Sequence, residues 1–231
     1  MSLIEISTLV KTYNTNGLAV DAIRRISLEI KKGEFSALAG PSGSGKTTLL
    51  NLIGALDKPT SGSIKIDDTE ITGLSPRALS DMRLNKIGFI FQAYNLIPVL
   101  TAVENVEYIL LLQGVDKKER RDRSEAILKE VGLAKEINRL PKELSGGQQQ
   151  RVAVARAIVS EPGLILADEP TANLDQKTGA DLLDLMHELN SRKKITFVFS
   201  THDPMVMNRA ARLINLIDGE IISDKSRKAR K

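Results

Sequence analysis

The sequence predicts an α/β fold in which a largely parallel sheet is covered by helices. Compact apolar runs of four to six residues alternate along the chain with amphipathic runs of helical spacing, and this alternation is typical of strand–helix units. The apolar runs are hydrophobic at nearly every position, as expected of parallel strands buried on both faces. A chain of 231 residues can bury such a core by itself.

The strands are expected in two groups. Three short amphipathic runs near the N-terminus predict an antiparallel annex: Ile4–Leu9, Arg25–Ile30 and Ser63–Ile66. Five compact apolar runs predict the central sheet: Phe35–Ala39, Ile87–Phe91, Leu164–Ala167, Ile195–Ser200 and Leu213–Ile217. The pairs Phe89/Phe91 and Phe197/Phe199 are two residues apart, so each pair is expected to put one face of its strand into a core.

The segment 93–160 has a different pattern of apolar and charged residues from the rest of the chain. Val103–Leu112 and Ser124–Val131 have helical spacing, and the charge run Lys117–Arg123 is interpreted as a solvated helix start or loop, in preference to an anion site. We therefore expect one domain over 1–231. Its parts are a core with the annex (1–92 and 161–224), a helical subdomain (93–160) and a basic tail (225–231).

Composition excludes several classes of protein. Cysteine is absent, which excludes disulfides and cysteine-based metal sites. The longest apolar stretch, Leu100–Val115, is interrupted by Glu104, Glu107 and Gln113, whereas about 18 uninterrupted apolar residues are needed to span a bilayer. No signal-peptide pattern is present at the N-terminus, so the cytoplasm is the expected compartment.

The net charge of +4 arises from the C-terminal tail. Five of the 33 basic residues, and no acidic ones, lie in 225–231, which leaves 28 basic and 29 acidic residues, a net of −1, in the rest of the chain. Aromatic residues make up 3% and tryptophan is absent, so platforms for base stacking are scarce. Direct nucleic-acid binding is not expected, and the tail is interpreted as solubilising or, alternatively, as a contact with anionic lipid.

A phosphate-binding loop is predicted between the strand Phe35–Ala39 and the helical run Thr47–Ala55. The sequence Gly-Pro-Ser-Gly-Ser-Gly-Lys-Thr at 40–47 fits the pattern G-x-x-x-x-G-K-[ST] in its required strand–loop–helix context. Its N–H groups and the helix N-terminus would face the phosphates, Lys46 would reach the β- and γ-phosphates, and Thr47 would ligate Mg²⁺. The candidate residues are Gly40, Pro41, Ser42, Gly43, Ser44, Gly45, Lys46, Thr47 and Thr48.

Two acidic residues end the apolar strand Leu164–Ala167. Asp168 is placed to complete the Mg²⁺ shell, and Glu169 can point differently and polarise the attacking water as a general base.

A second anion site is predicted where Ser145, Gly146, Gly147 and Gln148 precede the helical run Gln149–Val159. One chain already has its phosphate loop, so this helix N-terminus is expected to serve the nucleotide of another subunit.

With these three motifs the chain resembles the ATP-binding subunit of ABC (ATP-binding cassette) transporters. Gly40–Thr47 corresponds to Walker A, Leu144–Gln148 to the signature and Leu164–Glu169 to Walker B. The resemblance implies a P-loop NTPase (RecA-like) core with an antiparallel β annex and an inserted helical subdomain. It also implies ATP and Mg²⁺ as cofactors, and two copies that close head to tail around two ATP molecules.

Four further positions match the family in order. Tyr13 corresponds to the aromatic residue that stacks on adenine, Gln92 to the Q-loop glutamine that touches Mg²⁺ and water, Asp175 to the D-loop and His202 to the switch histidine that faces the γ-phosphate. His187 is interpreted as a surface histidine. The residues to which the resemblance gives catalytic roles are Glu169, His202, Gln92 and Lys46.

The segment Phe91–Val106 follows the pattern of the lipoprotein-release and macrolide-export group, although Tyr94 stands where Phe is common. Members of that group work with a separate membrane permease. The resemblance therefore implies a peripheral protein on the cytoplasmic face of the cell membrane, partnered by a second copy and a permease. Leu96–Leu100 is apolar and contains Pro98, so we expect part of it to be exposed as a docking surface; burial within the helical subdomain is the alternative.

Four other functions compete with this one. A cell-division type of ABC ATPase, which regulates a membrane partner without transport, remains open. A GTPase is disfavoured because Asn85–Gly88 lacks the aspartate that reads guanine. A cassette protein acting on nucleic acid or the ribosome is disfavoured, because such proteins usually carry two cassettes or a long inserted arm and this sequence shows one cassette. A scaffold without turnover is disfavoured because Glu169, Gln92 and His202 are all present.

Overall fold

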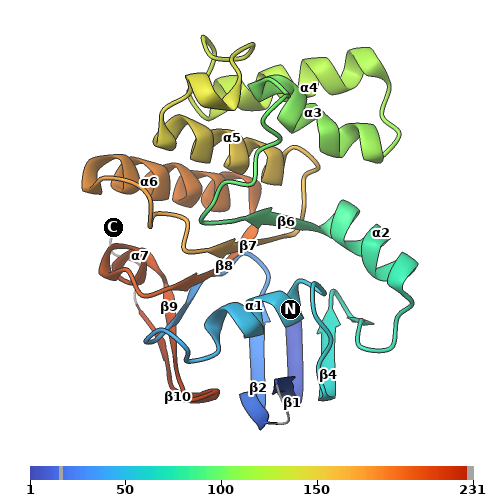
Figure 1. Cartoon of the computed structure of the whole chain (residues 1–231), viewed down its shortest axis with the longest axis vertical. Coiled ribbons are helices and arrows are strands. Elements are labelled where there is room, and N and C mark those ends of the chain that lie inside the picture. The colour runs from blue at the N-terminus through green and yellow to red at the C-terminus, as the bar shows by residue number, and fades with distance from the viewer. Residues whose placement is uncertain (16–17, 228–231) are drawn as a thin grey trace.

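The computed structural model describes residues 1–15 and 18–227 (Figure 1). Its larger sheet has the strand order β10-β9-β3-β8-β7-β6. The strands are β3 (Phe35–Ala39), β6 (Ile87–Ile90), β7 (Leu164–Asp168), β8 (Thr196–Thr201), β9 (Arg212–Ile217) and β10 (Glu220–Ser226). All neighbouring pairs are parallel except β9 and β10, so the predicted α/β fold is confirmed.

The smaller sheet has the order β2-β1-β4-β5 and is antiparallel, as expected of the annex. Its strands are β1 (Ser2–Thr15), β2 (Leu18–Lys31), β4 (Ser61–Ile66) and β5 (Thr69–Glu70). The strands β1 and β2 extend well beyond the apolar runs that predicted them. Backbone pairing continues over Lys11–Thr15 of β1, which is largely polar, and over Leu18–Ile23 of β2, which is largely apolar.

Strand β10 corrects the interpretation of the tail. Lys225, predicted to lie beyond the last strand, belongs to β10 and pairs with Leu213 of β9. The Arg227 side chain donates a hydrogen bond to the Met207 carbonyl at 2.9 Å. The polar face of an edge strand gives no apolar run in the sequence, which is why β10 was missed. The remaining tail residues, 228–231, lie outside the described part of the chain.

The helices are α1 (Lys46–Ile53), α2 (Pro76–Lys86), α3 (Ala102–Leu112), α4 (Lys117–Glu130), α5 (Gly146–Ile158), α6 (Gln176–Lys193) and α7 (Pro204–Arg209), with a short 3₁₀ helix at Pro141–Glu143. Helices α3, α4 and α5 lie between β6 and β7 in sequence and gather at the end of the molecule opposite the small sheet (Figure 1). None of the helices in the described residues is long and apolar enough to cross a bilayer.

Two helices were not predicted. Helix α2 buries only Leu79, so it lacks the apolar stripe on which a prediction depends. Helix α7 is only six residues long. The charge run Lys117–Arg123 forms the first turns of α4, which Asp116 caps by accepting a hydrogen bond from the Lys118 N–H. This confirms the solvated helix start.

The large sheet separates two hydrophobic cores. Along β3, Phe35, Ala37 and Ala39 face α3, α5 and α6, whereas Leu38 faces α1 and the small sheet. Strand β7 alternates in the same way, because successive strand residues point to opposite faces. The core between α1 and the small sheet holds the annex against the large sheet.

The two phenylalanine pairs differ in burial. Phe197 and Phe199 are fully buried beside Phe35, as predicted. Phe89 and Phe91 are both half-buried, and their rings stack at 5.8 Å and line a surface groove. Phe89 nevertheless packs against the core between α1 and the small sheet, so the prediction is wrong only for Phe91. Phe91 also lies beyond the end of β6.

Candidate nucleotide site

The phosphate loop connects β3 to α1 and requires glycine at two positions. Gly40 has φ +152° and Gly45 has φ +97°. A Cβ atom on Gly40 would lie 2.2 Å from the Leu216 carbonyl oxygen, and one on Gly45 would lie 2.5 Å from the Ala22 carbonyl oxygen. The loop is therefore packed against the backbones of β9 and β2, and only glycine fits at these contacts.

The lysine of the loop is buried and folded over it. Lys46 Nζ donates hydrogen bonds to the carbonyl oxygens of Gly40 and Pro41 at 2.9 and 2.8 Å. The Ser44 hydroxyl is buried and has no hydrogen-bond partner among the described residues. A cationic group and an unsatisfied hydroxyl at the start of a helix fit an anionic ligand such as a polyphosphate.

The first acidic residue at the end of β7 lies against this loop. The Thr47 hydroxyl donates a hydrogen bond to Asp168 Oδ1 at 3.0 Å, although 121 positions separate the two residues. Both follow or end strands of the parallel sheet, and the carboxyl edge of such a sheet is where ligands bind. A hydroxyl paired with a carboxylate there is an oxygen donor set that suits Mg²⁺.

The second acidic residue, Glu169, points to the loop after β8. Its φ is +45° and its N–H donates to the Ser200 carbonyl at 2.9 Å. Its carboxylate accepts hydrogen bonds from the Thr201 hydroxyl at 3.0 Å and the His202 N–H at 3.1 Å, and Oε1 lies 2.5 Å from His202 Nδ1. The Glu169 side chain is 14% exposed and that of His202 is 70% exposed, so the histidine lies at the mouth of the site.

Gln92 lies in the turn after β6, which ends at Ile90 and not at Phe91 as predicted. The Gln92 side chain is exposed. Its carbonyl accepts a hydrogen bond from the Asn173 side chain at 2.9 Å, which joins this turn to the predicted D-loop.

The predicted signature forms the N-terminus of α5. Ser145 caps the helix: its hydroxyl accepts from the Gln148 N–H at 3.3 Å, and its own N–H donates to Gln148 Oε1 at 2.9 Å. A Cβ on Gly147 would lie 2.4 Å from the methyl group of Thr178 on α6. In the described residues no hydrogen bond joins Ser145–Gln148 to the phosphate loop, so the structure does not bring this motif into the site of its own chain.

Asp175, the predicted D-loop residue, caps α6. Its carboxylate accepts hydrogen bonds from the Thr178 hydroxyl at 2.6 Å and the Thr178 N–H at 3.0 Å. These bonds lower the pKa of the Asp175 carboxyl below its ordinary value.

Tyr13 lies within β1, which extends past the predicted strand Ile4–Leu9. Burial raises the pKa of its hydroxyl, as does the hydrogen bond to Asp57, and a hydrogen-bonding contact with Thr48 opposes the rise. Tyr13 therefore contacts Asp57, in the loop after α1, and Thr48, at the start of α1.

His187 is exposed, in agreement with its interpretation as a surface histidine.

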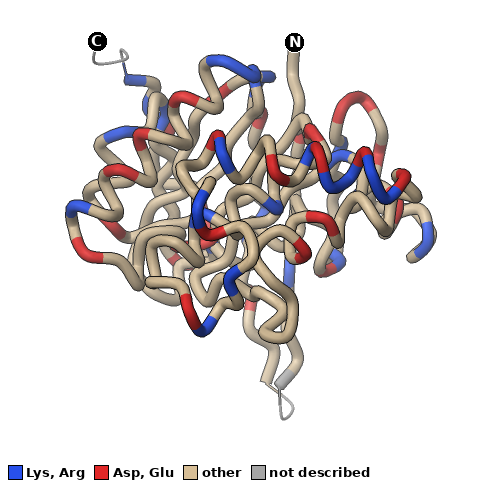
Figure 2. Tube along the Cα trace, turned by 90° about the horizontal axis from the view of Figure 1, so that it is seen from above, with Lys and Arg blue, Asp and Glu red and all other residues tan. Residues whose placement is uncertain are grey.

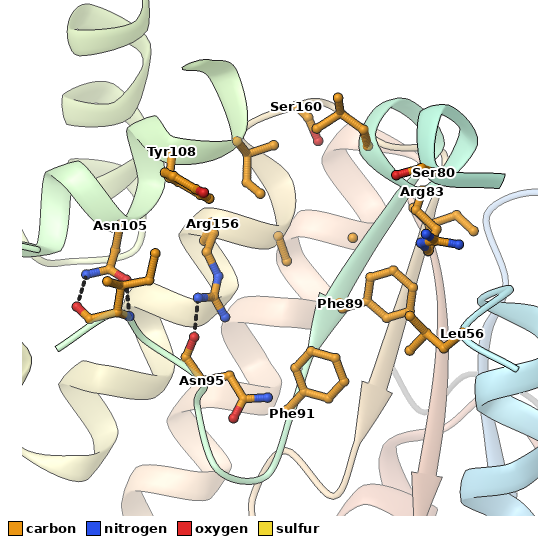
Figure 3. A pocket seen from close by; sticks show the side chains of 16 residues that line it. Leu56, Ser80, Arg83, Phe89, Phe91, Asn95, Asn105, Tyr108, Arg156 and Ser160 are labelled. Carbon is orange, nitrogen blue, oxygen red and sulfur yellow. Dashed lines mark hydrogen bonds between the residues drawn. The ribbon is translucent and has the colours of Figure 1, made fainter. Parts of the chain in front are cut away.

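Three residues near these motifs were missed. Lys11 and Asp57 contact Tyr13. The sequence gives a weak indication of the Lys11 contact, because Lys11 is two residues from Tyr13 and residues two apart on a strand share a face. Arg156 of α5 donates hydrogen bonds to the Asn95 carbonyl oxygen at 2.5 Å (Figure 3) and to the Tyr94 carbonyl oxygen at 2.9 Å. Both carbonyls belong to residues with positive φ, a conformation that sequence spacing does not reveal.

Comparison with known proteins identifies the family. A family model described as ABC transporter matches residues 23–172. An uncharacterised ABC transporter ATP-binding protein of Thermotoga maritima is 44% identical, over 95% of this chain and 93% of the relative. The lipoprotein-releasing system ATP-binding protein LolD of Geobacter metallireducens is 42% identical, over 96% of this chain and 99% of the relative.

A longer relative and a solved structure agree with these matches. The macrolide export ATP-binding/permease protein MacB of Syntrophobacter fumaroxidans is 44% identical over 96% of this chain, which spans 31% of the MacB length. The dimeric post-hydrolysis structure of the ATP-binding cassette MJ0796 bound to ADP and Pi superposes with a TM-score of 0.91 at 43% identity, covering 99% of this chain and all of that one. The chain therefore belongs to the ABC transporter family, as an ATP-binding and ATP-hydrolysing subunit.

Proposed function

We propose that this chain binds MgATP at 40–48, hydrolyses it with Glu169 as general base, and uses the cycle to drive a separate membrane permease of the lipoprotein-release or macrolide-export type. One observation carries the proposal. The Thr47–Asp168 hydrogen bond and the contacts of Glu169 with Thr201 and His202 collect at the carboxyl edge of one parallel sheet.

The phosphate loop accounts for nucleotide binding. Its backbone N–H groups, Lys46 and the Ser44 hydroxyl face the phosphates, and these hydrogen bonds replace those that Lys46 makes with the loop carbonyls. Thr47, Asp168 and Gln92 would hold Mg²⁺. Held there, Mg²⁺ would supply positive charge that offsets the negative charge developing on the phosphates during hydrolysis.

Glu169 accounts for hydrolysis. A carboxylate oxygen can accept two hydrogen bonds, and Oε2 accepts only that of Thr201 among the described residues. Its remaining lone pair can take a proton from a water that attacks the γ-phosphorus, and ADP leaves from the opposite side. His202 lies beside the same carboxylate, and its other ring nitrogen would be available to the γ-phosphate.

A second copy completes each site. The signature residues Ser145–Gly147 are exposed or half-buried and make no hydrogen bond to the phosphate loop within the described chain. The helix N-terminus at Ser145 suits an anion. Dimeric structures are known for the similar cassette MJ0796, which supports a head-to-tail dimer in which each ATP lies between the loop of one chain and the signature of the other.

A groove beside Gln92 suits the permease. It has a volume of about 470 Å³. Leu56, Phe89 and Phe91 lie on one side of it and Tyr108 on the other (Figure 3), and Ile97 also lines it. Such a surface, open and adjacent to a catalytic turn, fits a short apolar segment of a membrane protein.

The predicted docking segment Leu96–Leu100 is divided between core and surface. Leu96 packs against the core, whereas Val99 is 78% exposed. Asn105 fixes the segment: its side chain donates to the carbonyls of Leu100 and Thr101 at 2.9 and 3.0 Å and accepts from the Ile97 N–H at 2.8 Å. The exposed part is therefore presented beside the groove in a fixed shape.

Charge on the rest of the surface does not suggest a nucleic-acid partner. Figure 2 shows lysine and arginine interspersed with aspartate and glutamate along the described trace. Binding to a polyanion favours a basic patch or stripe, and α4, the helix with the densest charge, pairs Arg121 with Glu125 and Arg123 with Glu119. The proposed location is the cytoplasmic face of the membrane, through the permease.

Capture of the permease tests the proposal. We expect the tagged wild-type chain to co-purify, from detergent-solubilised membranes of its native cells, with a membrane protein of four helices and a large external domain. Tyr108→Glu places charge in the groove and should abolish this association while leaving ATP binding intact. Lys118→Glu, on the exposed start of α4, is the matched control. Retention of the permease by Tyr108→Glu would contradict docking in the groove.

A further inference from the structure

Lys11, Tyr13 and Asp57 form a closed cluster at one edge of the nucleotide site. Lys11 and Tyr13 lie two residues apart on β1, so their side chains share a face of the strand. Lys11 Nζ donates hydrogen bonds to Asp57 Oδ1 and to the Lys58 carbonyl oxygen, both at 2.7 Å. The Tyr13 hydroxyl donates to the other carboxylate oxygen, Asp57 Oδ2, at 2.6 Å.

The cluster leaves one face of the Tyr13 ring open. Lys11 Nζ lies 4.6 Å from the centre of the ring, within the range of a cation–π contact. The Lys11 side chain is only 12% exposed, whereas Tyr13 is 38% exposed. The ammonium group therefore covers one face of the ring, while Tyr13 as a whole keeps enough exposed area for a base to stack on.

The carboxylate of Asp57 remains charged in this setting. Burial raises the pKa of Asp57, but hydrogen bonds from Lys11, Tyr13 and the Lys58 N–H outweigh burial and bring the pKa below its ordinary value. The anion accordingly holds both neighbours at neutral pH. A ring that is tied at its hydroxyl and covered on one face has lost the rotamer freedom that an exposed tyrosine keeps.

We infer that Lys11 and Asp57 are positioning residues of an adenine subsite, which hold the Tyr13 ring in the plane against which the base of ATP stacks. The inference rests on the proposed function, ATP binding at 40–48, and on the role that the family resemblance gives Tyr13, which is to stack on adenine. It adds residues to which no motif assigns a role. The contribution is preorganisation: a ring that is already fixed loses less conformational entropy when the base binds.

Nucleotide binding to the isolated chain tests the inference, with isothermal titration of MgATP and of Mg-tripolyphosphate, which has the phosphates but lacks a base. Lys11→Met should weaken ATP binding by roughly 2- to 10-fold, the value of one immobilised side chain, and leave tripolyphosphate binding unchanged. In a Tyr13→Ala background Lys11→Met should have no further effect, because the residue acts through the ring. Lys31→Met, an exposed lysine on the adjacent strand β2, is the control.

Two results would overturn the inference. Equal weakening of ATP and tripolyphosphate would mean that Lys11 acts on the phosphates, and unchanged ATP binding would mean that the ring needs no support. Tyr13→Phe keeps the ring but removes the bond to Asp57 and the contact with Thr48, and it should show a smaller effect in the same direction, even if Lys11→Met impairs folding. Failure of the proposed function would be seen separately, as a wild-type chain that releases no phosphate from ATP. That result would leave the ratio of the binding constants for MgATP and Mg-tripolyphosphate unchanged.

Discussion

Replacement of Glu169 by Gln tests the assignment of the general base while changing little else. The carboxylate accepts hydrogen bonds from the Thr201 hydroxyl and the His202 N–H. The amide introduced by Glu169→Gln keeps a carbonyl oxygen that can accept one of them, but it cannot accept a proton from water at neutral pH. The substitution therefore removes the proposed chemistry and retains the shape of the side chain.

The magnitudes follow from these contacts. A general base contributes roughly 10²- to 10⁴-fold to a rate, so kcat should fall by that factor, about 3–5 kcal/mol in the activation barrier. Loss of one hydrogen bond to a side chain that is 14% exposed costs about 1 kcal/mol of the free energy of unfolding. For a chain of this length that lowers Tm by about 2–4 °C.

The assay is phosphate release at saturating MgATP, compared with the molar mass in solution measured by light scattering. We expect Glu169→Gln to stop turnover and to accumulate as an ATP-dependent dimer, because binding to the phosphate loop and the signature is intact. The wild type should form this dimer only transiently. Unchanged phosphate release by the variant would refute the role of Glu169.

Three further predictions concern packing and docking. Gly147→Ala places a Cβ 2.4 Å from the Thr178 methyl group, so the start of α5 must shift, and the ATP-dependent dimer should be lost in light scattering while monomer binding of ATP persists. Gly88→Ala places a Cβ 2.3 Å from the Ala157 carbonyl oxygen and should lower the free energy of unfolding by about 1–3 kcal/mol in urea. Val99→Asp, on an exposed side chain, should release the captured permease without changing Tm; a lower Tm would indicate that Val99 supports the fold.

The sequence by itself determined the chemistry and most of the architecture. A phosphate loop, an acidic strand end and a second glycine-rich helix start have fixed local geometry, so their residues could be named before their positions were known. Buried strands were found for a similar reason: Phe35–Ala39 is apolar at nearly every position because both of its faces are covered. Half-exposed elements such as α2 and β10 carry no such pattern and were missed.

Tertiary structure alone decided which of these residues meet. The Thr47–Asp168 and Glu169–His202 contacts join segments 121 and 33 positions apart, and they form because parallel strands end at one edge of the sheet. The pairing of Asp57 with Lys11 and Tyr13 has the same origin, since the loop after α1 folds back on β1. Sequence specifies the donors and acceptors, but distance in space depends on sheet order and core packing, which no local pattern encodes.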